Sequence, residues 1–187
     1  IVPYFEKPEV VLRKNVGDDI IFYGAMNRHE NEISAMWFIK NVMPRISDLN
    51  VRYIVVGNKP SENLKKFASE KVVFTGFVED VHPYFASAKC LAAPIQAGAG
   101  IKVKILEAMA MGVPVLTNSI GIEGIDARDG FEYLHCETPE EYEETIRLIN
   151  KGSIDSEKIA KNALNMVNSN YDLKKSFLAY SKKVYTL

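Results

Sequence analysis

Two lysines and a glutamate interrupt an otherwise apolar helical segment that directly follows a glycine-rich loop. The loop contains Gly98 and Gly100, and the segment 102–111 begins with Lys102 and Lys104. The first turn of a helix has unpaired N–H groups and a partial positive charge, so each lysine there costs about 0.3–1 kcal/mol unless an anion lies nearby. Because glycines let the backbone approach a phosphate closely, this combination predicts a phosphate-binding site.

The side chains of this segment allow more than one interpretation. Lys102 is expected to extend from the end of the helix into a cleft, where a diphosphate would make its charge favourable. Alternatively, Lys102 and Lys104 both extend into water, and their spacing leaves the two possibilities open. Glu107 could accept hydrogen bonds from two ribose hydroxyls or pair with Lys104 three residues earlier, and spacing does not decide between these.

The segments around this loop alternate between short β-type runs and helical stretches. Compact apolar runs predict buried strands at 20–24, 51–57, 72–76, 90–94, 113–117 and 132–135. Apolar residues at helical spacing predict helices at 31–46, 60–67, 81–87, 102–111, 139–150, 157–168 and 173–185. The alternation predicts an α/β fold, a Rossmann-like parallel sheet of about six strands with helices on both faces. In such a sheet, ligands bind beyond the carboxyl ends of the strands, where the glycine loop lies.

The composition of the chain excludes several classes of protein. The 187 residues are 47% hydrophobic and 25% charged, and the formal net charge of -1 predicts no nucleic-acid partner. The two cysteines, Cys90 and Cys136, predict neither a disulfide framework nor a zinc site and suit a reducing compartment. No apolar stretch approaches the ~20 residues that span a bilayer. We expect a cytoplasmic protein, and any attachment to the inner membrane surface would come from residues outside this chain.

The first eighteen residues differ from the rest of the chain. Residues 1–8 contain two prolines and no hydrophobic period, and the chain begins with Ile1 rather than methionine. We interpret residues 1–18 as a connector from a missing N-terminal domain and residues 19–187 as a single domain.

Several spaced motifs resemble the donor-binding region of the retaining glycosyltransferases called group 1, which have the two-domain GT-B fold. The run 102–115 is very close to the family's signature, and residues 22–26, 74–80 and 121–125 also match in the right order. The resemblance extends from about residue 20 to residue 187 and covers only the family's C-terminal half. It implies that residues 19–187 form the nucleotide-sugar donor-binding domain, with C-terminal helices, of a GT-B enzyme.

The resemblance also implies roles for individual residues. Glu107 would hold the ribose, and Gly24 would end the first strand at the donor phosphates. The backbone N–H groups of Gly100 and Ile101 would bind the diphosphate, the two lysines would add charge, and Val78 would flank the base. The predicted donor-binding residues are Gly24, Val78, Gly98, Ala99, Gly100, Ile101, Lys102, Lys104 and Glu107. The family usually acts without metal, so we expect no metal site and no cofactor besides the nucleotide-diphosphate sugar, which is the donor substrate.

Three positions depart from the family's pattern. Ala99 replaces the first glutamate of the E-x7-E motif, which contacts the donor sugar, and Ala25 and Glu30 replace an arginine and a lysine that bind phosphate. Lys102 and Lys104 would substitute for these cations, and Arg28 could also reach in. Because catalytic residues partly belong to the missing half, none is assigned in this chain.

The predicted function is transfer of a sugar from a nucleotide-diphosphate sugar to an acceptor, with retention, in polysaccharide or glycolipid synthesis. Its partners would be the donor, the missing N-terminal domain, and an acceptor glycan or lipid-linked sugar. The isolated domain is expected to be inactive. Ala99, Ala25 and Glu30 favour one alternative, a non-catalytic nucleotide-binding module. Another is a GT-B nucleotide-sugar epimerase, whose known pattern lacks the run 102–115.

Overall fold

The computed structural model describes residue 13 and residues 15–171, which contain one six-stranded parallel sheet. The strands follow the order β3-β2-β1-β4-β5-β6. Their bounds are β1 (Asp19–Tyr23), β2 (Arg52–Val56), β3 (Val72–Gly76), β4 (Cys90–Ala93), β5 (Val115–Thr117) and β6 (Leu134–His135). Every neighbouring pair is parallel. The Rossmann-like α/β prediction is therefore confirmed, and each predicted strand is present at its expected place.

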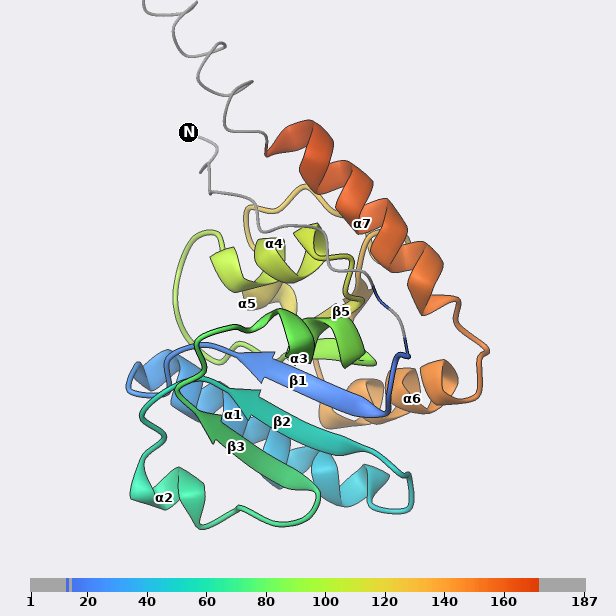
Figure 1. Ribbon diagram of the computed structural model, residues 1–187. Helices are drawn as coiled ribbons and strands as arrows, with labels where there is room; N and C mark the ends of the chain where they lie inside the picture. The colour runs from blue at the N-terminus through green and yellow to red at the C-terminus, as the bar shows by residue number, and fades with distance from the viewer. Residues whose placement is uncertain (1–12, 14, 172–187) are drawn as a thin grey trace, which may run out of the picture.

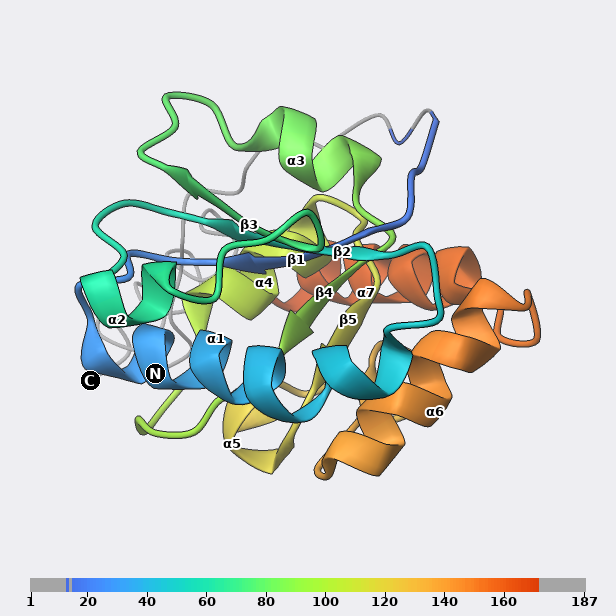
Figure 2. The ribbon, with the colours of Figure 1, turned by 90° about the horizontal axis from the view of Figure 1, so that it is seen from below.

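Helices cover both faces of the sheet, as predicted for strands buried on both sides. The helices of the described residues are α1 (His29–Asn41), α2 (Glu62–Lys65), α3 (His82–Ser87), α4 (Val103–Ala110), α5 (Ser119–Ile122), α6 (Pro139–Asn150), α7 (Ser156–Asn170) and the 3-10 helix η1 (Met43–Ile46). Figure 2 shows α3 on one face and α1 with α2 on the other. Helix α7 packs along α4 (Figure 1), and α6 contacts η1.

Three helices differ from the sequence prediction. The helix expected over 31–46 divides into α1 and η1, because Pro44 has no N–H to continue the α-helical ladder. The helix expected from residue 60 begins at Glu62, because the Ser61 hydroxyl accepts the Leu64 N–H and caps it. The sequence did not predict α5, which is capped by Asn118. Most of the predicted connector at residues 1–18, namely residues 1–12 and 14, and the predicted helix at 173–185 lie outside the described residues.

Aromatic packing fixes α1 to the sheet. Phe38 of α1 stacks on Tyr53 of β2 with ring centroids 4.3 Å apart, and it meets Tyr142 of α6 edge-to-face at 5.8 Å. All three rings are fully buried. Such pairs add about 0.5–1.5 kcal/mol each beyond the area they bury. The position of the first turn of α1, at the carboxyl edge of the sheet, therefore follows from the core.

The hydroxyl of Tyr53 provides a test of this core. It is buried and has no hydrogen-bond partner among the described residues, and an unsatisfied buried polar group costs about 1–3 kcal/mol. Tyr53→Phe keeps the ring stack and removes that group, so we expect the free energy of unfolding to stay equal or to rise by about 1 kcal/mol. Tyr53→Ala, by contrast, should lose about 3–5 kcal/mol.

Urea unfolding followed by circular dichroism measures both variants. A loss greater than about 1 kcal/mol in Tyr53→Phe would contradict the assignment of an unpaired hydroxyl, since only a lost hydrogen bond produces it.

Candidate functional site

A cavity of about 470 Å³ opens at the carboxyl ends of β1 and β4. The chain leaves β1 toward β2, whereas β4 lies on the opposite side of β1, so the loops that follow the two strands diverge here. The lining residues are Tyr23, Gly24, Ala25, Arg28, Glu30, Asn31, Ile95, Ala97, Gly98, Ala99, Ile101, Lys102, Val103 and Lys104. A second hollow, of about 650 Å³, lies beside the edge strand β3 and is lined by none of the predicted donor-binding residues.

Gly24 ends β1 in a conformation that only glycine adopts readily. Its φ is +150°, and a Cβ built there would lie 2.7 Å from Nδ2 of Asn31 and 3.0 Å from Nζ of Lys104. Its N–H donates to the carbonyl of Val56 at 3.0 Å, which holds this turn against the end of β2. The glycine thus leaves room for polar side chains to reach the end of the strand.

Lys104 extends beneath this turn rather than into open water. Its ammonium donates a hydrogen bond to Oδ1 of Asn31 and lies 4.8 Å from the centre of the Phe22 ring. Asn31 in turn donates through Nδ2 to the carbonyl of Ala25 at 2.9 Å. Lys104 therefore does not extend into water, which was one possibility that the spacing left open for both lysines. A cation is therefore held at the inner wall of the cavity.

Lys102 lies at the N-cap of α4 and folds back over the glycine loop. Its Nζ donates to the carbonyl of Gly100 at 2.6 Å, and only 11% of its side chain is exposed. No side chain caps α4. Within the described part of the chain, the N–H groups of residues 101–104 have no hydrogen-bond partner. Two lysines and a set of free N–H groups thus give the mouth of the cavity a positive character.

Glu107 lies one turn further into α4 and is half-buried. It forms no hydrogen bond or ion pair with the described residues, so of the two possibilities that spacing left open, the pairing with Lys104 does not occur. Burial raises the pKa of its carboxyl group, and the nearby Lys104 charge offsets this rise only in part. A carboxylate that is partly desolvated and unpaired retains its capacity to accept hydrogen bonds from a ligand.

Arg28 is held at the rim of the cavity by its neighbour. Its Nε donates to Glu30 at 2.8 Å, and 69% of the Arg28 side chain is exposed. Glu30 thus neutralises the charge of Arg28 at the rim of the cavity. The positive charge at the inner wall therefore comes from Lys104.

The structure brings together most of the residues predicted from the sequence. Gly24 lines the cavity together with residues 98, 99, 101, 102 and 104. Gly100 lies in the same loop, but its N–H donates to Glu123 at 2.9 Å. Val78 packs against the core in the loop after β3 and does not line the cavity. Its predicted place beside a base remains a prediction.

Sequence reasoning assigned no role to two residues that matter here. Asn31 connects the turn after β1 to Lys104, and the sequence carried no signal for it, since it lay at the expected start of a helix. Glu123 stands between two glycines in the run 121–124, a signal that marked the loop but not the contact. The described residues contain no cluster of side chains suited to a metal ion. None of their helices is long and apolar enough to cross a membrane.

The buried ammonium makes stability depend on pH. Burial, followed by the Arg28 charge, lowers the pKa of Lys104 to about 8 from an ordinary value of 10.5. The unfolded chain therefore binds more protons between these values, and stability rises with pH across that interval. Lys104→Met should raise the free energy of unfolding at pH 7 by about 1–3 kcal/mol, and this gain should disappear near pH 10.5.

Urea titrations at pH 7, 9 and 10.5 measure the effect. Lys40→Met is the matched control, because Lys40 is exposed and lies 5.4 Å from the centre of the Phe67 ring, outside the cavity. An equal gain in both variants, or a gain that does not change with pH, would show that Lys104 is not buried as a charge.

The chain matches a known family and several known proteins. The model of the family described as glycosyl transferases group 1 matches residues 17–151. An uncharacterized 44.6 kDa protein in the cps region of Klebsiella pneumoniae is 26% identical over 176 residues, covering 88% of this chain and 45% of that protein. The chain therefore spans less than half the length of this relative.

Solved structures share the fold of the chain. A glycosyltransferase from Rickettsia africae ESF-5 aligns with a TM-score of 0.76 at 17% identity, over 92% of this chain and 48% of that one. Alr3699/HepE from Anabaena, solved with UDP and glucose, aligns with a TM-score of 0.71 at 18% identity, over 92% and 49%. The family match covers well over half of the sequence and includes the glycine loop and α4. The chain therefore belongs to the group 1 glycosyl transferases.

Proposed function

We propose that this chain is the donor-binding half of a retaining glycosyltransferase whose donor is a nucleoside diphosphate sugar. The observation that carries the proposal is the ammonium of Lys104, partly buried beside Gly24 at the inner wall of the cavity. A partly desolvated cation needs a strong reason to be kept, because desolvation makes it costly. A diphosphate in the cavity would supply that reason through charge-assisted hydrogen bonds.

Further groups fit the same ligand, although Glu107 is not among the residues that line the cavity. The free N–H groups at the start of α4 suit phosphate oxygens, and Lys102 adds a second cation beside them. The cations that bind the phosphates thus belong to the chain, and we propose that no metal ion or other cofactor takes part. Glu107 would accept hydrogen bonds from the ribose, because its carboxylate has no partner of its own among the described residues.

Known proteins suggest the choice of donor and the setting of the reaction. The Anabaena structure holds UDP and glucose, which makes UDP the first nucleotide to test. The Klebsiella relative lies in a cps region, which supports a role in polysaccharide synthesis. We propose that the protein acts in the cytoplasm on a glycan or lipid-linked acceptor. The acceptor site and part of the catalytic machinery would belong to an N-terminal domain, so this chain alone would transfer nothing.

A second candidate is a nucleotide-binding module without catalysis. Ala99 favours it, because its methyl group lines the cavity where the resemblance places a carboxylate against the donor sugar. Turnover of UDP-glucose by the full-length protein distinguishes the two functions. Ala99→Glu should raise turnover if only this sugar contact is missing, whereas a non-catalytic module should stay inactive in both forms.

Lys104→Met tests the binding site directly. Calorimetric titration of the 187-residue chain with UDP, GDP and ADP should show saturable binding of one of them. Loss of the ammonium should weaken that binding by about 10- to 100-fold, while the affinity for the matching nucleoside stays unchanged. Lys40→Met is again the control, since it removes an equal charge outside the cavity.

Absence of binding of all three nucleotides at millimolar concentration would refute the proposed function. Equal losses in Lys104→Met and Lys40→Met would instead show that the effect comes from net charge and not from a contact in the cavity.

A further inference from the structure

The glycine loop already holds an anion, and the anion belongs to the chain itself. Oε2 of Glu123 accepts the N–H of Gly100 at 2.9 Å and lies 3.6 Å from Nζ of Lys102. Gly100 stands between Ala99 and Ile101, which both line the cavity. A carboxylate therefore occupies a backbone donor beside the cavity, the one that the family resemblance assigns to the diphosphate of the donor.

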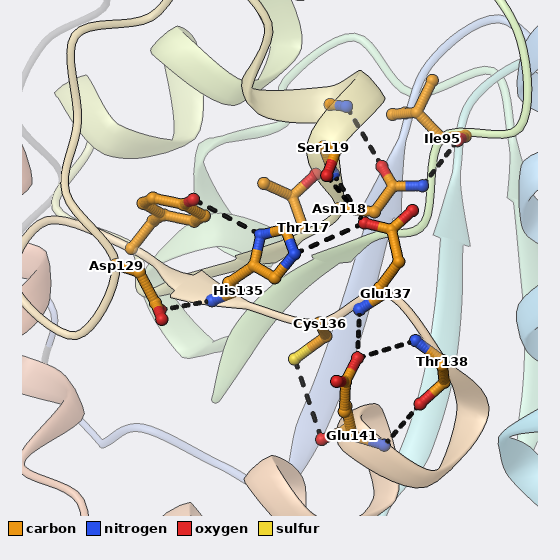
Figure 3. A network of polar contacts seen from close by, with 12 residues as sticks. Ile95, Thr117, Asn118, Ser119, Asp129, His135, Cys136, Glu137, Thr138 and Glu141 are labelled. Carbon is orange, nitrogen blue, oxygen red and sulfur yellow. Dashed lines mark hydrogen bonds and ion pairs between the residues drawn. The ribbon is translucent and has the colours of Figure 1, made fainter.

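The position of Glu123 follows from the packing of the segment that carries it. Asn118 caps α5 by accepting the Gly121 N–H at 3.0 Å and donates through Nδ2 to the carbonyl of Ile95 at 2.7 Å (Figure 3). At the other end of α5, Gly124 has a φ of +77°, and a Cβ there would lie 2.8 Å from Cγ1 of Ile101. The segment thus packs closely on the glycine loop and brings the carboxylate to it.

The Gly100 N–H cannot donate a full hydrogen bond to a carboxylate and to a phosphate at the same time. Both are anions, so they would also repel each other beside Lys102. The Glu123 side chain is 52% exposed and has room to turn toward water. A phosphate can therefore replace the carboxylate as the acceptor of the Gly100 N–H. This replacement requires only a rotation of the Glu123 side chain and no movement of the fold.

We propose that Glu123 occupies the diphosphate position of the empty site, competes with the donor for it and is displaced when the donor binds. This inference rests on the proposed function. A ligand must bring enough negative charge to displace the carboxylate from Gly100 and Lys102, and a nucleoside brings none. The bound carboxylate reduces the fraction of chains that are ready to bind, and it lowers the apparent affinity by that fraction.

Two substitutions test the proposal. Glu123→Gln keeps the shape and removes the charge, and Glu123→Ala removes the group. We expect both to bind the nucleoside diphosphate about three- to tenfold more tightly than the wild-type chain, with Ala at least as tight as Gln. Affinity for the matching nucleoside should not change, because it does not reach the contested N–H group.

Glu137→Gln is the matched control. Glu137 is also half-exposed, at 46%, and its Oε2 accepts the backbone N–H of Ser119 at 3.0 Å at the opposite end of α5 (Figure 3). It therefore reproduces the loss of one charge and of one contact between a carboxylate and the backbone of this segment. We expect its affinity for UDP, GDP and ADP to equal that of the wild-type chain.

The titrations use UDP, GDP and ADP with all four proteins, and a nitrogen–proton spectrum follows the Gly100 amide. Weaker binding by the Glu123 variants would overturn the proposal, because Glu123 would then only brace the loop. Unchanged binding, or a gain equal to that of Glu137→Gln, would overturn it as well. Failure of the wild-type chain to bind any nucleotide would contradict the proposed function itself, which separates the two failures.

Discussion

The position of β1 between β2 and β4 is the constraint on which the site depends. All these strands are parallel, so their carboxyl ends lie at one edge of the sheet. The chain turns from β1 toward β2, and the loop after β4 leads to the other side. Side chains from the first turn of α1 and from the start of α4 can therefore meet across the gap, as Asn31 and Lys104 do. Neither helix could form the site alone.

The groups at this edge reduce the stability of the domain. Lys104 keeps an ammonium at the inner wall, Glu107 has no hydrogen-bond or ion-pair partner among the described residues, and the start of α4 carries no side-chain cap. Each feature is unfavourable in an empty domain and favourable beside a polyanionic ligand with hydroxyl groups. The buried aromatic cluster around Phe38 offsets these losses at a distance from the cavity. The domain thus combines a tightly packed core beneath the site with polar groups in the site that lack hydrogen-bond partners within the described part of the chain.

Glu123 stabilises the glycine loop in the domain without ligand. Its carboxylate accepts the Gly100 N–H and lies within ion-pair distance of Lys102, so one donor of the glycine loop is already occupied. The same contact places a negative charge where the proposed donor has its own. An anion carried by the chain can stabilise the empty loop and lower the affinity for the donor at once, because both effects come from one hydrogen bond.

Local pattern in the sequence was enough to determine the strands, most helices and the glycine loop. Buried strands and amphipathic helices follow from hydrophobic spacing, and the run 102–115 carries a recognisable motif. The direction of Lys104 and the contact between Glu123 and Gly100 were decided by the tertiary structure. The lysine and Glu123 bond to residues 73 and 23 positions away. Such pairs depend on how separate elements pack, which residue spacing does not encode.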